Sequence, residues 1–184
     1  MNDSGTISGG MDEIRAMALE IPTGTLVQMP LEIVRLQRDE LGHADLFTKV
    51  LRRMRTFSES MGVAVGNAEE VIWKQFAEKS PLLGLWVAHR GGVIEAHLHA
   101  DIRPWNGANV AWIAQAKIDD PKFWAADQVT EVLNQVMQWV RDLNVEFPQL
   151  GVQEILFNTF RDAKVWQRRF GFVPHSTLLA RKLL

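Results

Sequence analysis

The 184-residue sequence predicts one α+β domain of the α/β class, with a mixed, mostly antiparallel central sheet of about six strands flanked by about four helices. Three observations predict this class. Residues 110–118 alternate between two unequal faces, which is the period of an extended strand. Residues 122–143 repeat apolar side chains every three or four positions, as one face of a helix does. Two shorter apolar runs flank Gly91-Gly92, which indicates a hairpin.

Composition narrows the class of protein further. Apolar residues make up 47% of the chain and charged residues 23%, which is ordinary for a globular domain. The formal charge of −2 gives no basic footprint for nucleic acid, and no apolar run is long enough to cross a membrane. Cysteine is absent, which suits a reducing compartment and favours a cytoplasmic protein. Tyrosine is absent too, whereas there are seven tryptophans.

The first part of the chain differs from the rest. Residues 1–10 are small and polar, and residues 11–20 have the spacing of one short helix. We therefore divide the chain into an N-terminal appendage, residues 1–28, and a single domain, residues 29–184. The appendage is expected to be partly disordered or bound to a partner.

The domain begins with a strand and two helices. Residues 31–36 are a short strand candidate, and residues 44–56 carry an apolar stripe of helical period. Asn67, with Glu70 three positions later, has the spacing of a capping box and opens a second helix that ends at Pro81. The arginines of the first helix are expected to face outward: Arg52, Arg53 and Arg55.

Three strands follow in sequence. Strands over 82–88 and 93–102 flank the turn at Arg90-Gly91-Gly92, and residues 103–107 turn the chain back into the strand over 110–118. Because the connections are short, we expect an antiparallel meander.

A helical crossover comes next. Pro121 ends the third strand of the meander, and the helix over 122–143 leads to a mostly apolar strand over 154–160. Because it follows a helical crossover, this strand is expected to lie parallel to 110–118. The remaining predicted elements are a short helix over 163–170 and a last strand over 172–182.

Two segments resemble those of a known family. From Phe157 to Phe172 an asparagine loop leads to a short helix that ends in an aromatic residue and Gly-Phe. Ile118-Asp119-Asp120-Pro121 is similar to the segment before an acetyl-CoA pyrophosphate loop. Together with the order of elements, these segments resemble the GCN5-related N-acetyltransferase (GNAT) family over about residues 31–184. The resemblance implies a GNAT-like fold.

The resemblance also implies a function, which is acetyl transfer from acetyl-CoA to an amine by direct attack. In that family the third meander strand and the next strand part, and the pantetheine arm pairs with backbone exposed between them. The implied cofactor-binding residues are Lys117, Ile118 and Asp119 for the pantetheine arm, Trp124, Ala125 and Ala126 for the pyrophosphate, and Asn158 and Trp166 beside the thioester.

The sequence departs from the family pattern at two places. Residues 122–127 put Cβ atoms, an indole and a carboxylate where the family has arginine and glycines, which obstructs the approach of backbone to phosphate. Trp166 stands in place of the tyrosine acid. A second hypothesis is therefore a catalytically degenerate interaction or structural module, for example a virion-associated bacteriophage protein that binds a protein partner through its N-terminal arm. The sequence does not decide the oligomeric state and allows a homo-oligomer.

One strand face carries the candidate catalytic residues. Glu95, His97 and His99 alternate along the strand over 93–102 and are expected to share a face with Asp101, opposite the apolar face with Ile94. Direct attack needs a general base for the amine proton, and these three are the candidates. The same pattern also fits a solvent-facing or helix-covered polar strip. A metal site at the two histidines is a further alternative, but we expect no metal.

Overall fold

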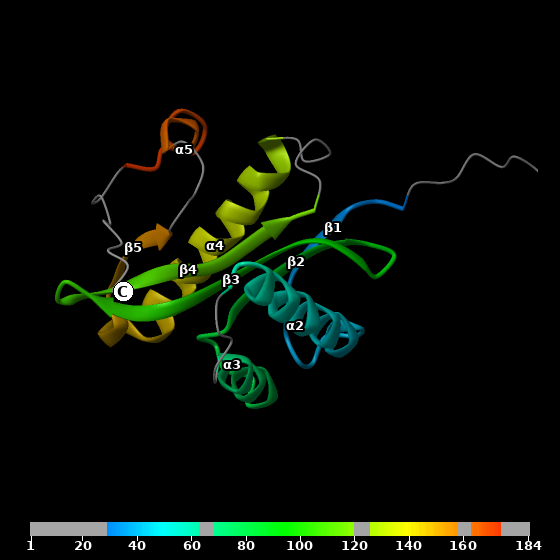
Figure 1. Ribbon diagram of the computed structural model, residues 1–184. Coiled ribbons are helices and arrows are strands. Elements are labelled where there is room, and N and C mark those ends of the chain that lie inside the picture. Colours follow the sequence, from blue (N-terminus) through cyan, green and yellow to red (C-terminus); the bar gives the residue numbers. More distant parts are fainter. Residues whose placement is uncertain (1–28, 63–67, 120–125, 158–162, 174–184) are drawn as a thin grey trace, which may run out of the picture.

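The computed structural model describes residues 29–62, 68–119, 126–157 and 163–173 (Figure 1). These residues form one five-stranded sheet in the order β1-β2-β3-β4-β5. Helices α2 and α3 cover one face of the sheet and α4 covers the other. The elements are β1 (Glu32–Arg35), α2 (His43–Ser60), α3 (Ala68–Ala77), β2 (Gly84–Arg90), β3 (Val93–Trp105), β4 (Ala108–Ile118), α4 (Ala126–Glu146), the 3-10 turn η1 (Pro148–Leu150), β5 (Val152–Phe157) and α5 (Ala163–Phe170).

The predicted order of elements is confirmed over the described residues. Strands β2, β3 and β4 form an antiparallel meander, and β5 lies parallel to β4 after the α4 crossover. Three predictions lie wholly or largely outside the described residues: the helix over 11–20, the capping Asn67 and the last strand over 172–182.

Two-residue turns join the strands of the meander. Gly91 and Gly92 have φ of +54° and +79°, and Asn106 and Gly107 have φ of +47° and +83°. Glycine and asparagine tolerate this left-handed region, which suits the twist of a hairpin. The second turn is therefore shorter than the predicted span of 103–107.

Strand β3 is longer than predicted because it runs through a proline. Pro104 lies opposite Asn109 in the ladder with β4. Strand β2 pairs with β3 only as far as Ala100, so the proline lies beyond the last described pair on that side. A missing N–H is tolerated there, and Pro104 does not end the strand.

Alternating side chains of β2 contribute to two hydrophobic cores. Leu85 and Val87 pack with α2 and α3, whereas Trp86 packs with α4. Trp86 meets Trp139 of α4 edge-on at 5.4 Å between ring centroids. Trp139 Nε1 donates to Pro81 O at 2.9 Å. Helices on both faces thus hold the sheet that carries the candidate site.

Two bulges interrupt the alternation along the sheet. The register leaves Glu95 of β3 without an opposite residue in β2, and Ala114 of β4 without one in β3. As a result, Ile94 packs into the α2 and α3 core, while Leu98 packs into the α4 core. The expectation that Ile94 lies on the face of the strand opposite His97 is therefore wrong, because both residues lie on the side of α2.

Candidate functional site

Strand β4 extends past its partner β5. The two strands pair from Asn109 opposite Val152 to Ile113 opposite Phe157. Residues 114–118 of β4 continue beyond the last of these pairs. The bulge at Ala114 follows directly after Ile113, the last residue of β4 whose pairing with β5 is described.

On its other side, the end of β4 stays paired with β3. Ile118 lies opposite Ala96, and Asp119 N donates to Glu95 O at 3.0 Å. Backbone groups alternate in direction along an antiparallel ladder. Ala116 and Ile118 therefore direct their N–H and C=O groups away from β3, toward the side of β5.

Aromatic side chains gather around the described end of β5. The Trp166 ring of α5 meets the ring of Phe157, the last paired residue of β5, at 4.7 Å between centroids. Phe170 and Phe172 complete this group at 5.3 and 6.1 Å from Trp166. Of the other implied cofactor residues, Ala126 is the first residue of α4. Trp124, Ala125 and Asn158 lie outside the described residues.

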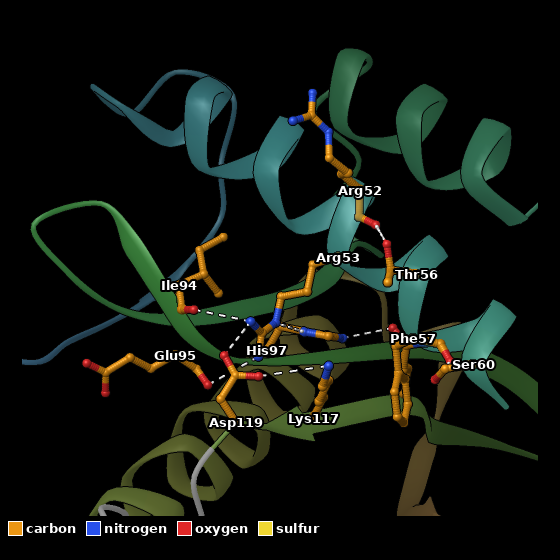
Figure 2. A network of polar contacts seen from close by, with 11 residues as sticks. Arg52, Arg53, Thr56, Phe57, Ser60, Ile94, Glu95, His97, Lys117 and Asp119 are labelled. Atoms are coloured by element: carbon orange, nitrogen blue, oxygen red, sulfur yellow. Dashed lines mark hydrogen bonds and ion pairs between the residues drawn. The ribbon is translucent and has the colours of Figure 1, made fainter.

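A polar network under α2 holds the ends of β3 and β4 together (Figure 2). Arg53 Nε donates to His97 Nδ1 at 3.1 Å, and Nη2 donates to Glu95 O at 3.2 Å. Nη1 donates to Ile94 O at 3.2 Å and to Asp119 Oδ2 at 2.6 Å. The prediction that Arg53 faces outward is wrong, because its side chain is only 16% exposed and reaches the bulge of β3.

Lys117 joins the same network from β4. Its Nζ lies 3.9 Å from Asp119 Oδ1 and 5.5 Å from the centre of the Phe57 ring. Both Lys117 and Asp119, two of the residues expected to bind the pantetheine arm, therefore direct side chains toward α2.

His97 is buried with both ring nitrogens occupied. Its Nδ1 accepts from Arg53, and its Nε2 lies 2.8 Å from Gln115 Oε1. Because a guanidinium can only donate, the proton of the neutral ring is on Nε2. Burial, aided by the charges of Arg53 and Lys117 and opposed by the bond to Gln115, lowers the pKa of His97 to about 4. The ring is therefore neutral at pH 7.

The three candidate catalytic residues do not form one group. The carboxylate of Glu95 pairs with Arg90 of β2 at 2.9 Å and points away from His97 (Figure 2). His97 lies beneath α2, as the helix-covered interpretation predicts. His99 instead lines a cavity.

The cavity has a volume of about 290 Å³ and lies between α2, α3 and the sheet. His99 Nε2 lies 3.0 Å from Asp101 Oδ1, without the alignment of a hydrogen bond. Burial opposes ionisation of Asp101, but His99 and Arg103 outweigh it and lower the pKa of Asp101. The bulged Ala114 and neighbouring Gln115 also line the cavity, so it extends along β4 to the residue that follows the last described pair with β5.

The described residues contain neither a candidate metal centre nor a membrane-spanning helix. In these ranges no group of three or more His, Asp or Glu side chains is placed to hold a metal ion. None of the helices in the same ranges combines the length and apolar character needed to cross a membrane.

Solved structures of acetyltransferases share the fold. AAC(6')-Iy in complex with the bisubstrate analogue CoA-S-monomethyl-acetylneamine superposes with a TM-score of 0.54 at 15% identity, covering 84% of this chain and 99% of that one. A predicted acetyltransferase from Clostridium acetobutylicum with acetyl-CoA gives 0.53 at 12% identity, covering 84% and 96%. Glucosamine-6-phosphate N-acetyltransferase from Arabidopsis thaliana gives 0.52 at 13% identity, covering 83% and 98%. No family model and no curated protein matches the sequence.

Proposed function

On the premise that this chain has the GNAT fold, we propose that it transfers an acetyl group from acetyl-CoA to an amine by direct attack. The observation that carries the proposal is that β4 continues past Ile113, opposite the last described residue of β5, with Ala116 and Ile118 directing backbone groups away from β3. These groups lie on the side of β5, and the cavity lined by His99 is also lined by Ala114 and Gln115, the two residues of β4 that precede Ala116. A cofactor arm and an acceptor amine could thus meet at Ala114.

The backbone directions refine which residues would hold the pantetheine arm. Of the three residues that the resemblance implies, Ile118 directs its N–H and C=O groups toward β5. Ala116, which is not one of the three, does the same. Lys117 and Asp119 direct theirs toward β3. The pyrophosphate would lie at the first turn of α4, where N–H groups have no partner within the helix. Asp127, the acidic residue of that turn, opposes an anion there.

His99 is better placed as the general base than Glu95 or His97. The carboxylate of Asp101 beside Nε2 favours the tautomer with its proton on Nε2, which leaves Nδ1 to accept a proton. The amine nitrogen forms the new bond to the acetyl carbon as the carbon–sulfur bond breaks. The amine loses one proton and the sulfur gains one, so the products are an amide and the CoA thiol.

The backbone slot is tested by calorimetric titration of acetyl-CoA. Ala116→Pro removes the N–H directed at the slot while keeping an extended backbone, and we expect roughly tenfold weaker binding. Ala116→Val keeps the N–H and should bind like the unaltered protein. Circular dichroism checks that both variants fold. Absence of heat from the unaltered protein at millimolar acetyl-CoA would overturn the proposed function.

A further inference from the structure

A series of hydrogen bonds, all donated in the same direction, runs from Arg53 of α2 into the cavity. Arg53 also binds Asp119 at the end of β4. Arg53 Nε donates to His97 Nδ1 at 3.1 Å, and His97 Nε2 faces Gln115 Oε1 at 2.8 Å. Gln115 Nε2 then donates to Ser58 Oγ at 3.1 Å. Because Arg53 can only donate, it sets the donor and acceptor role of each later group. We name Arg53, His97, Gln115 and Ser58 the relay.

Ser58 is the last residue of the relay, and its hydroxyl proton is not donated to any described residue. Its oxygen accepts from Gln115, and no hydrogen bond from its hydroxyl to another described residue is present. Met54 O, the carbonyl one turn back that a helical serine commonly uses, instead receives a weak bond from Gln115 Nε2 at 3.4 Å. By contrast, Thr56 and Ser60 of the same helix both donate to carbonyls of α2.

Ser58 also lines the cavity, across from the groups that would receive the amine. Its hydroxyl is therefore available as a donor to whatever lies there. The volume of about 290 Å³ is at the small end for ligand pockets. A small molecule fits such a space better than a chain segment does.

We propose that the relay makes this cavity selective for small primary amines that carry an oxygen acceptor near the amine. The inference rests on the proposed function in taking the amine as the occupant. Ser58 is the specificity-determining contact. Arg53 and His97 are positioning residues, because they act on the amine only through Gln115 and Ser58, and Gln115, which also lines the cavity, orients the Ser58 hydroxyl.

The direction of the relay depends on Arg53. If the proton of His97 moved to Nδ1, Nε2 would become an acceptor and would favour the Gln115 amide turned with its NH₂ group toward the ring. Gln115 oxygen would then face Ser58, and the hydroxyl would donate to it rather than into the cavity. The groups that face His97 are Arg53 from α2, Lys117 and Gln115 from β4, and His99 from β3.

The first measurement is nitrogen NMR of the His97 ring, which needs no ligand. We expect a neutral ring with its proton on Nε2 at pH 7. Arg53→Met should populate both tautomers, because it removes the donor to Nδ1, whereas Val87→Ala should not. A proton on Nδ1 in the unaltered protein would overturn the inference.

The second measurement compares 2-methoxyethylamine with n-butylamine, which differ by an ether oxygen in place of a methylene group. Binding is followed by NMR without acetyl-CoA. Ser58→Ala should lower the ratio of the two affinities by roughly five- to tenfold, as expected for one hydrogen bond. Ser60→Ala, whose hydroxyl donates to Phe57 O, is the matched control and should leave the ratio unchanged.

An unchanged ratio in Ser58→Ala, or no binding of either amine to the unaltered protein, would overturn the inference. Neither measurement uses acetyl-CoA, so failure of the relay and failure of the proposed function are separate results.

Discussion

At the scale of single residues, two histidines of β3 have different roles because different groups surround them. His97 and His99 are 4% and 5% exposed. Arg53 and Gln115 occupy both nitrogens of His97, whereas His99 has a carboxylate on one side and the cavity on the other. Both residues are histidines of one strand, so the neighbours from α2 and β4 decide how the ring nitrogens of His97 are occupied.

The neutral state of His97 predicts a pH dependence of stability. The unfolded ring takes up a proton near its ordinary pKa of 6.5, whereas the folded ring stays neutral down to a pKa of about 4. The free energy of unfolding should therefore be highest above pH 6.5 and fall as pH drops to 4, by on the order of 3 kcal/mol. His97→Gln should flatten this dependence. Denaturant unfolding between pH 4 and 7 measures it.

A core substitution provides the control. Val87→Ala removes buried apolar volume but no titratable group. Its free energy of unfolding should therefore lie below that of the unaltered protein by the same amount at every pH. If the His97→Gln curve also ran parallel to the unaltered one, His97 would not be the source of the pH dependence.

At the scale of elements, the absence of a side chain at Gly84 lets β2, β3 and α4 approach closely. A Cβ at this position would lie 2.8 Å from Trp139 Cη2 and 2.9 Å from Ala100 O. The constraint is therefore steric, and it comes from α4 and from the backbone of β3. The sequence gives Gly84 no such significance, because neither neighbour is near it in the chain.

We expect Gly84→Ala to lower the free energy of unfolding by about 1–3 kcal/mol, because the added methyl group overpacks this contact. Trp139→Phe shortens the ring that the methyl group meets, so the cost of Gly84→Ala should be smaller in that background. Denaturant unfolding of the four variants in this cycle measures the difference. Equal costs in both backgrounds would show that the indole does not limit the space at Gly84.

At the scale of the whole molecule, two cores on opposite faces of one sheet hold the candidate site. One packs α2 and α3 against β2, and the other packs α4 against β2, β3 and β4. The relay lies under α2, and the end of β4 connects it to the proposed cofactor slot. The solved structures that share the fold do not decide between an enzyme and a structural module, and acetyl transfer stays the function that we propose.

The division of the chain at residue 28 predicts the result of a truncation. Among the described residues, those of both cores lie between 33 and 157. We therefore expect residues 29–184 alone to keep the free energy of unfolding within about 0.5 kcal/mol of the full chain, and to bind acetyl-CoA equally well. Denaturant unfolding and calorimetry measure both. A loss above about 1 kcal/mol would show that the N-terminal segment belongs to the folded domain, rather than serving as a partner-binding arm.

The order of elements, both hairpins and the parallel crossover followed from the sequence by itself. Each depends on local signals, namely the period of apolar residues and the conformations that Gly91-Gly92 and Asn106-Gly107 allow. The predicted end of β3 at residue 102 falls short of its observed end at Trp105. Pro104 looks like a strand breaker locally, but β3 lacks a described partner on one side there.

Only the tertiary structure decided which polar side chains form the candidate site. Arg53 meets His97 across 44 positions of the chain, and Glu95 turns to Arg90 at a bulge. The physical reason is that helical or strand period tells which side chains share a face within one element. It does not tell where the sheet bulges, or which side chain of a covering helix reaches the strand below.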